Sequence, residues 1–239
     1  MNKFAVIIST YQRPDGKTPF YLNRCLNSLY KQYYKNFKVY VIGDKYEDKV
    51  EFNSILSNFI NKIQIQSVNL PNAKEREKYL GKNNKALWMY GGVNATNHGI
   101  NLAKNDGLNL ICMLDHDDWW SPRHLRNLNE GILKTGAKFI CSKSTHINGS
   151  LPNVKIKDRF INFLPKRRTY IKSSVCVNIN EIPFLCRDLY EMTKECKTPA
   201  DADMWDQISN IINKKNLKSY LVNEVTCYHD EEGYTKTIK

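Results

Sequence analysis

The sequence predicts an open α/β fold whose sheet is mixed, mostly parallel and flanked by helices. Three short apolar runs, Phe4–Ser9, Val39–Gly43 and Leu110–Leu114, are continuous, which is typical of strands covered on both faces. Segments with helical periodicity separate these runs, so we expect right-handed crossovers between parallel strands. Such sheets bind ligands beyond the carboxyl ends of their strands, and the loops that follow the three runs are therefore the candidates for a binding site.

The helices follow from the spacing of apolar residues. Within residues 22–29 the apolar positions fall at i, i+3, i+4 and i+7, and a weaker amphipathic segment, residues 93–103, precedes the third run. After that run, Ser121 and Pro122 have the residue types of an N-cap and a first-turn proline. We expect them to begin a helix that carries the apolar residues of 125–132.

The last third of the chain has a different pattern. From about Gly149 to Ile182 we expect short β-like pieces, Arg159–Leu164 and Tyr170–Asn178, which we interpret as an elaboration added to the sheet. An apolar stripe from Met204 to Ile212 predicts one helix. Residues Tyr220–Tyr228 are expected to form the last strand.

Composition places the chain among ordinary globular proteins. Its 239 residues, 41% hydrophobic and 25% charged, suffice for one domain over residues 1–239. No apolar stretch approaches the roughly 18 residues of a membrane span, so we expect a cytoplasmic protein with no integral membrane segment and no secretion signal. The seven cysteines are scattered and lack ligand spacings, which predicts free thiols in a reducing compartment.

The net charge of +12 would suit a polyanionic partner such as nucleic acid. Lysine is abundant along the whole chain, however, and no basic block extends beyond Lys166-Arg167-Arg168. A general compositional bias therefore accounts for the charge better than a focused binding stripe does. Nucleic acid is possible as a partner but is not favoured.

Three acids, Asp115, Asp117 and Asp118, fall within four residues directly after the third apolar run. Like charges so close raise one another's pKa unless a cation compensates. In an extended segment residues i and i+2 face the same way, so Asp115 and Asp117 can address one ligand while His116 points elsewhere. Carboxylate oxygens suit Mg²⁺ or Mn²⁺, which also bind phosphate oxygens. The sequence therefore predicts a metal-assisted site for a phosphorylated ligand.

Five stretches resemble glycosyltransferase family 2, an inverting family with the GT-A fold. In order they are FAVIISTYQRP, CLNSLYKQYYKNFKVYVIGD, ATNHGINLAK, LDHDDWWSP and DADMWDQI, and they span positions 4 to about 212. Each stretch alone is weak, but the ordered set is specific. The resemblance implies metal-dependent transfer of a sugar from a nucleotide sugar, most often a UDP-sugar, to a hydroxyl of a glycan or glycoconjugate. Residues 1–120 would bind the nucleotide sugar, and 121–239 would form the acceptor and catalytic half.

The same resemblance implies roles for residues in the first half. Thr10, Tyr11 and Arg13 match the first-strand loop that lines the nucleoside pocket. Asp44 matches the acid that contacts the nucleotide base, although its neighbours depart from the family pattern and leave the base open. A threonine stands where an arginine commonly precedes Asn97, so Asn94, Asn97 and Lys85 are the candidates for phosphate or base contacts.

The D-x-D motif of the family corresponds to Asp115 and Asp117, with His116 in the loop that shapes donor selectivity. The resemblance assigns Asp115 to the ribose and Asp117 to a Mn²⁺ or Mg²⁺ ion on the diphosphate, with Asp115 as a further candidate ligand. The late acidic pattern places the catalytic base at Asp201. The C-terminal tyrosine-to-histidine pattern makes His229 a candidate for the metal or the diphosphate.

Two alternatives stay open at this point. The same chemistry could act on a nucleic-acid acceptor, which salt-sensitive binding to DNA or RNA would reveal. The chain could also be a catalytically degenerate module that binds a nucleotide sugar or nucleic acid. The presence of both the D-x-D motif and the late acid favours catalysis over a degenerate module.

Overall fold

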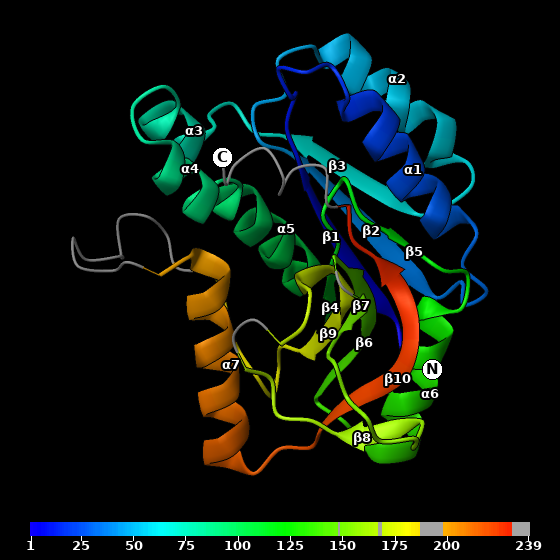
Figure 1. Cartoon of the computed structure of the whole chain (residues 1–239). Helices are drawn as coiled ribbons and strands as arrows, with labels where there is room; N and C mark the ends of the chain where they lie inside the picture. The colour runs from blue at the N-terminus through cyan, green and yellow to red at the C-terminus, as the bar shows by residue number, and fades with distance from the viewer. Residues whose placement is uncertain (148, 167–168, 187–197, 231–239) are drawn as a thin grey trace.

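The computed structural model describes residues 1–147, 149–166, 169–186 and 198–230 (Figure 1). The strands are β1 (Phe4–Thr10), β2 (Phe37–Gly43), β3 (Ile65–Asn69), β4 (Leu110–Met113), β5 (Trp119–Trp120), β6 (Phe139–His146), β7 (Gly149–Leu151), β8 (Phe160–Asn162), β9 (Val175–Asn178) and β10 (Ser219–Tyr228). The helices are α1 (Thr18–Tyr30), α2 (Lys49–Ile60), α3 (Lys74–Tyr79), α4 (Asn84–Tyr90), α5 (Val93–Asn105), α6 (His124–Thr135) and α7 (Ala200–Lys215), with a 3₁₀ turn, η1 (Lys172–Ser174).

Within the described residues the strands form one mixed sheet in the order β3-β2-β1-β4-β9-β6-β10-β5, with β7 beside β6 and β8 beside β10. Strands β3, β2, β1 and β4 are parallel, and β1 runs level with β2 from Phe4↔Phe37 to Thr10↔Gly43. Their carboxyl ends therefore open on the same edge of the sheet. The predicted α/β fold is confirmed, and the loops after the three apolar runs meet at this edge.

The other half of the sheet mixes strand directions. Strand β9 lies antiparallel between β4 and β6, whereas β10 is parallel to β6. Register shifts after Val222 and Val225 interrupt the pairing of β10 with β6. Such irregularities bend a strand. Here β10 ends beside β5, which directly follows the acidic loop.

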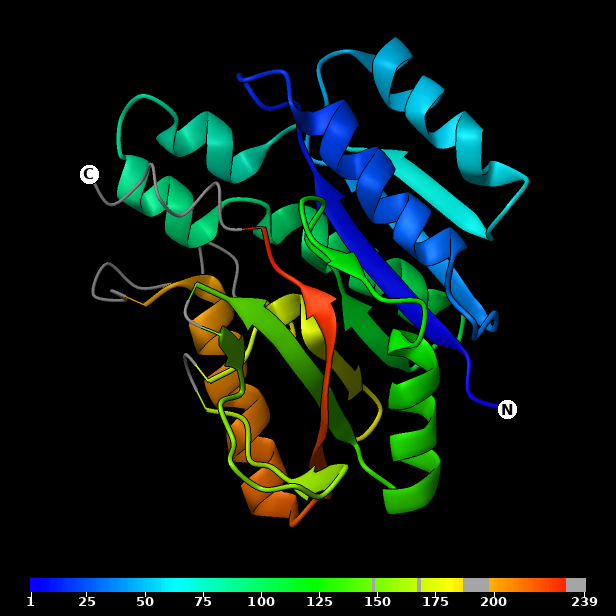
Figure 2. The same cartoon turned by 45° about the vertical axis from the view of Figure 1, so that its right-hand side comes forward.

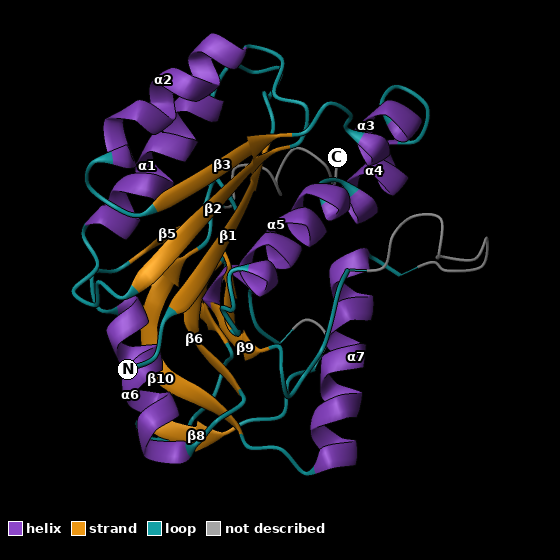
Figure 3. Cartoon of the chain, turned by 180° about the vertical axis from the view of Figure 1, so that it is seen from behind, coloured by secondary structure: helices purple, strands orange, loops and turns teal. Residues whose placement is uncertain are grey.

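Helices cover both faces of the sheet (Figures 2 and 3). Helices α1, α2 and α6 pack on one face, and α5 and α7 on the other. Apolar side chains from each set form the two cores, for example Leu22, Phe52 and Leu125 on the first face and Ile100, Met204 and Ile208 on the second. Helix α5 approaches very closely, because a Cβ atom at Gly99 would come within 2.5 Å of Ile7 Cγ2. Only glycine allows this spacing between α5 and β1.

The predicted start of α6 is wrong by two residues. The helix begins at His124 with Arg123 as the N-cap, and no side chain caps it. Ser121 instead pairs with strand β10, since its backbone N–H donates to the Thr226 carbonyl at 2.9 Å. Pro122 lies in the turn between β5 and the helix, where its missing N–H costs nothing.

The predicted β pieces of the elaboration are shorter than expected. The piece Arg159–Leu164 contains β8 alone, and the first part of Tyr170–Asn178 is the η1 turn. The turn directs Ser173 against the acidic loop, where its Oγ accepts the Asp115 N–H at 3.1 Å and its carbonyl accepts the Trp120 indole N–H at 2.6 Å. These contacts favour a turn over a longer strand.

The described cysteines, Cys25, Cys112, Cys141, Cys176, Cys186 and Cys227, are all free and buried, as predicted. The seventh, Cys196, and the basic pair Arg167-Arg168 lie outside the described residues. None of the helices in the described ranges has the length and apolar character needed to cross a membrane.

Candidate active site

Asp44 directly follows β2, beside the end of β1, and its side chain is buried. Arg76, from α3, donates through Nε to Asp44 Oδ2 at 3.3 Å and through its guanidinium to the Asp44 and Lys45 carbonyls. Its guanidinium carbon also lies 5.2 Å from the centre of the Tyr11 ring. Burial raises the pKa of Asp44 while Arg76 opposes the rise. No sequence motif pointed to Arg76.

Three buried polar atoms at this edge have no hydrogen-bond partner among the described residues: Thr10 Oγ1, Asp44 Oδ1 and His116 Nε2. The residues that carry these atoms lie close to the strand ends: the Asp44 N–H donates to the Thr10 carbonyl, and the His116 ring packs edge-on against Tyr11 with 5.6 Å between ring centres. A buried polar atom left unpaired costs about 1–3 kcal/mol. A polar ligand that reaches any of these atoms would remove the cost for that atom.

Asp115 is held from two sides by the η1 turn. Its carboxylate Oδ1 lies 2.5 Å from Lys172 Nζ, and its backbone N–H donates to Ser173 Oγ. Burial raises the pKa of Asp115, but the charge and hydrogen bond of Lys172 outweigh burial and leave the pKa lowered. Asp115 is therefore ionised and fixed in orientation.

Asp117 has a weaker partner. Its carboxylate lies 3.7 Å from an Arg13 nitrogen, while the same arginine binds Asp15 at 2.8 Å. Burial raises the pKa of Asp117, and the charges of Asp118 and Asp115 add to the rise. A half-buried carboxylate with incomplete compensation fits a divalent cation.

No three histidine, cysteine, aspartate or glutamate side chains cluster as a complete metal cage in the part of the chain that the structure describes. Mg²⁺ commonly takes one or two protein carboxylates and completes its shell with water and substrate phosphates. The donor set at Asp117 and Asp115 fits that mode and does not fit an all-protein site.

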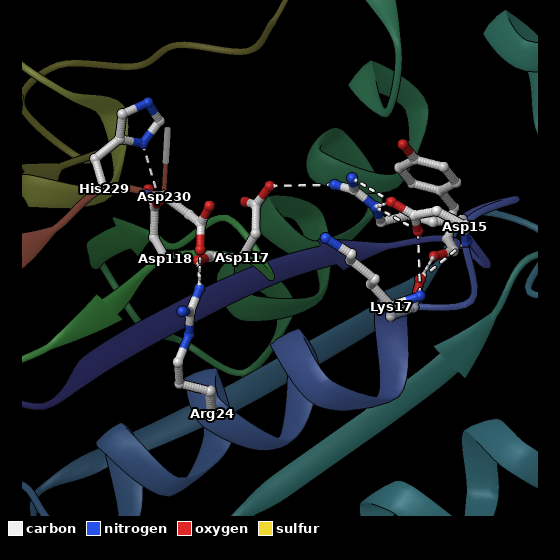
Figure 4. A network of polar contacts seen from close by, with 10 residues as sticks. Asp15, Lys17, Arg24, Asp117, Asp118, His229 and Asp230 are labelled. Atoms are coloured by element: carbon white, nitrogen blue, oxygen red, sulfur yellow. Dashed lines mark hydrogen bonds and ion pairs between the residues drawn. The ribbon is translucent and has the colours of Figure 1, made fainter. Parts of the chain in front are cut away.

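The third acid, Asp118, is fully buried and belongs to a network that we call the latch: Arg24, Asp118, His229 and Asp230 (Figure 4). Asp118 Oδ1 accepts His229 Nδ1 and the Asp230 N–H, both at 2.9 Å. Arg24 donates to the Asp230 carboxylate and to the Asp117 carbonyl, each at 2.5 Å. The latch ties the end of β10 to the acidic loop.

The latch also determines the protonation of His229. Burial lowers the pKa of His229, but Asp118 more than reverses this and raises it to about 9. A protonated imidazole cannot bind a metal, so coordination by His229 would require loss of that proton. Its role as a metal or diphosphate ligand stays a prediction.

Asp201 lies in the first turn of α7, where it is exposed and its Oδ1 accepts the Ala202 N–H at 2.7 Å. Asn97 uses both ends of its amide on the Cys186 backbone, at 2.6 and 2.9 Å. That pairing anchors the segment before residue 187, and a donor contact by Asn97 stays a prediction. The structure thus gathers Thr10, Tyr11, Arg13, Asp44 and the loop 115–117 at one edge, and places Asn97 in a structural contact.

The two tryptophans after the loop are packing residues. Trp120 is buried and stacks on His124 with 4.1 Å between ring centres. Trp119 stacks on Tyr228, and the Arg24 guanidinium lies 4.0 Å from its ring centre. The Trp119 ring therefore supports Arg24 in the latch.

Comparisons with known proteins agree with this geometry. The sequence profile described as Glycosyl transferase family 2 matches residues 88–191. An uncharacterized glycosyltransferase of Acanthamoeba polyphaga mimivirus is 41% identical over 244 residues, which cover 98% of this chain and 96% of the relative.

Solved structures show the same fold. One is residues 1–349 of S. aureus TarS in complex with UDP-GlcNAc, with a TM-score of 0.69 and 16% identity, where the match covers 95% of this chain and 58% of that TarS chain. Another is the mannosyltransferase PcManGT from Pyrobaculum calidifontis in complex with GDP-Man and Mn²⁺, with a TM-score of 0.58 and 12% identity, covering 98% of this chain and 59% of that one. The chain therefore spans less than two thirds of either solved protein.

Proposed function

Since the chain belongs to glycosyltransferase family 2, we propose that it transfers a sugar from a UDP-sugar to a hydroxyl of a glycan or glycoconjugate, with inversion at the anomeric carbon. The observation that carries the proposal is the set of unpartnered polar atoms on Thr10, Asp44 and His116 beside the half-compensated Asp117. Together they complement a ligand with a polar ring at one end and a diphosphate at the other.

The base end of the donor would meet Asp44. An ionised carboxylate only accepts hydrogen bonds, so the base has to present an N–H. Uracil does so at N3, and the TarS complex contains a UDP-sugar. Guanine also has such an N–H, which makes a GDP-sugar the main competitor.

The diphosphate would lie at the acidic loop. Asp117, with Asp115 beside it, would hold Mn²⁺ or Mg²⁺, which supplies positive charge to the leaving diphosphate. Arg13 lies close enough to Asp117 to donate to a diphosphate oxygen on the same side. Asp15 holds Arg13 in this position.

Asp201 would act as the base. Residues 121–239, the proposed acceptor half, place this carboxylate at the start of α7, where it is open to solvent. As the acceptor oxygen bonds to the anomeric carbon, Asp201 takes the hydroxyl proton and the bond to the diphosphate breaks. A base so placed contributes about 10²- to 10⁴-fold in rate. One displacement inverts the anomeric carbon.

The test is binding and hydrolysis of UDP-, GDP- and dTDP-sugars with Mn²⁺, Mg²⁺ or EDTA. We expect one UDP-sugar to bind to the wild type only when the metal is present. We expect the Asp117→Ala variant to lose this metal-dependent binding. Metal-dependent binding of a GDP-sugar alone would show that the nucleotide base of the donor is guanine and not uracil. Absence of binding by any donor would contradict the proposal and favour a catalytically degenerate module that binds nucleic acid through its positive charge.

A nucleic-acid acceptor is the second candidate, because the net charge is +12. Each phosphate contact by lysine or arginine releases counterions, so binding would weaken steeply with salt. Fluorescence anisotropy with labelled DNA and RNA at 50 and 200 mM salt separates this acceptor from a neutral glycan.

A further inference from the structure

Lys172 is a cation inside the proposed site that no sequence motif indicated. It lies in the η1 turn, and its ammonium nitrogen is 2.5 Å from Asp115 Oδ1. Its side chain keeps 25% of its surface exposed. Lys172 is therefore held in place and is still accessible to a ligand.

The support beneath Lys172 is rigid. The next residue, Ser173, is fully buried, accepts the Asp115 N–H through Oγ, and accepts the Trp120 indole N–H through its carbonyl. The backbone of the turn is thus fixed to the acidic loop at two further points. A side chain on such a support can select a ligand by position.

Lys172 also lies between the two ends of the proposed reaction. On one side its ammonium nitrogen pairs with Asp115, and on the other Tyr170, two residues before it, packs against Trp205 of α7 with 4.8 Å between ring centres. Helix α7 begins at Ala200, so the turn that carries Lys172 lies beside the helix that carries the proposed base. The transferred sugar has to lie between the diphosphate and the base, which places it beside Lys172.

We propose that Lys172 is a specificity-determining residue that binds the transferred sugar while Asp115 anchors it. This inference rests on the proposed function. An ammonium group has three N–H donors, and Asp115 accepts one. The remaining donors match the hydroxyl or acylamino oxygens of a sugar ring, which neither the base pocket at Asp44 nor the acidic loop would contact.

The experiment is calorimetric binding of UDP and of UDP-GlcNAc, UDP-glucose and UDP-galactose, each with Mn²⁺. Lys172→Met removes the ammonium group, and Lys138→Met is the matched control because Lys138 pairs with Glu181 at the start of β6. We expect Lys172→Met to weaken the tightest UDP-sugar by about ten- to a hundredfold, the range of a charge-assisted hydrogen bond. Its affinity for UDP should change less than about threefold, and Lys138→Met should change neither.

Parallel loss of UDP and UDP-sugar, or no loss, would overturn the inference while leaving the proposed function intact. Wild-type protein that binds UDP-sugars no more tightly than UDP would overturn it as well. Failure of the wild type to bind any of the four ligands would contradict both proposals. Should Lys172→Met not fold, Lys172→Arg keeps the charge but not the ammonium geometry, and selective loss of the UDP-sugar is read in that variant by the same criterion.

Discussion

Asp117 and Asp118 are consecutive acids with opposite surroundings. The Asp117 side chain is 28% exposed and its nearest cation stands 3.7 Å away. The Asp118 side chain is 0% exposed and accepts two hydrogen bonds from the latch. The Asp117 carboxylate has one distant cation, whereas Oδ1 of Asp118 has two hydrogen-bond donors inside the protein and Oδ2 of Asp118 is buried without a partner among the described residues. The extended backbone expected for this loop is wrong, because the Asp118 N–H donates to the Asp115 carbonyl at 3.0 Å and closes a turn. This turn separates the proposed ligand-binding acid from a structural one.

The contrast shows why an acidic cluster cannot be assigned as a unit. Charge alone makes the three acids of the loop equivalent, but their partners differ. Lys172 compensates Asp115, the latch compensates Asp118, and Asp117 remains for a ligand. Substitutions in the loop should therefore separate activity from stability.

The largest effect is expected at Asp117. The Asp117→Asn change removes the negative charge that would bind the metal but keeps the shape of the side chain. We expect sugar transfer to slow by about 10²- to 10³-fold, as for loss of one electrostatic stabiliser. The thermal midpoint should stay within about 2 °C of wild type. Steady-state kinetics and a thermal melt measure the two quantities. A strongly lowered thermal midpoint would show that Asp117, like Asp118, supports the fold, and would contradict the proposed difference between the two acids.

The next effect is expected at Asp118. The Asp118→Ala change leaves the protonated His229 and the Asp230 N–H without their acceptor, and breaking such a buried pair should lower the free energy of unfolding by about 3 kcal/mol. Urea titration followed by circular dichroism measures this loss. Wild-type stability in Asp118→Ala, together with lost donor binding, would reverse the assignment of the two acids.

A smaller effect should follow pH through His229. Its pKa in the folded protein, about 9, is above the value of an unfolded histidine, so its stabilisation is complete below about pH 6.5 and is lost as pH rises through about 9. Allowing for partial exposure, we expect the stability difference between wild type and His229→Gln to shrink by about 2 kcal/mol from pH 6 to pH 9.5. Urea titrations at the two pH values test it. A difference that grows with pH would mean that His229 is neutral in the latch.

The smallest effect is expected at Asp15, which holds Arg13 beside Asp117 from an exposed position. Exposed ion pairs contribute about 0.2–1 kcal/mol, so Asp15→Asn should weaken donor affinity by at most about fivefold. Calorimetry with UDP and Mn²⁺ checks this, with Asp158→Asn as a remote control. A loss above about twentyfold would show that Asp15 itself contacts the donor.

The parts predicted from the sequence are those carried by local pattern. Continuous apolar runs located β1, β2 and β4, and the parallel topology then placed Asp44 and the acidic loop at one edge. The position of Ser121 was not predictable, because its N–H is used by a strand that lies about a hundred residues further along the chain.

The site residues that were not predicted from the sequence lie on elements that carry no recognisable motif. Arg76 reaches Asp44 from a short helix, and Lys172 reaches Asp115 because β9 runs antiparallel to β4. Both are ordinary basic residues in a lysine-rich chain, so neither stands out by type or spacing. Their partners are set by the pairing of distant segments, which periodicity does not encode.

The latch joins residues that are made at very different times. Arg24 and Asp230 are 206 positions apart, and His229 is 111 positions after Asp118. During synthesis the acidic loop leaves the ribosome long before His229 and Asp230 do. Contacts between residues so far apart in the chain form late in folding. A nascent chain that already has its central strands and the η1 turn would therefore hold the acidic loop through Asp115 alone, and the Asp118 end of the loop would be fixed only when residues 229–230 emerge.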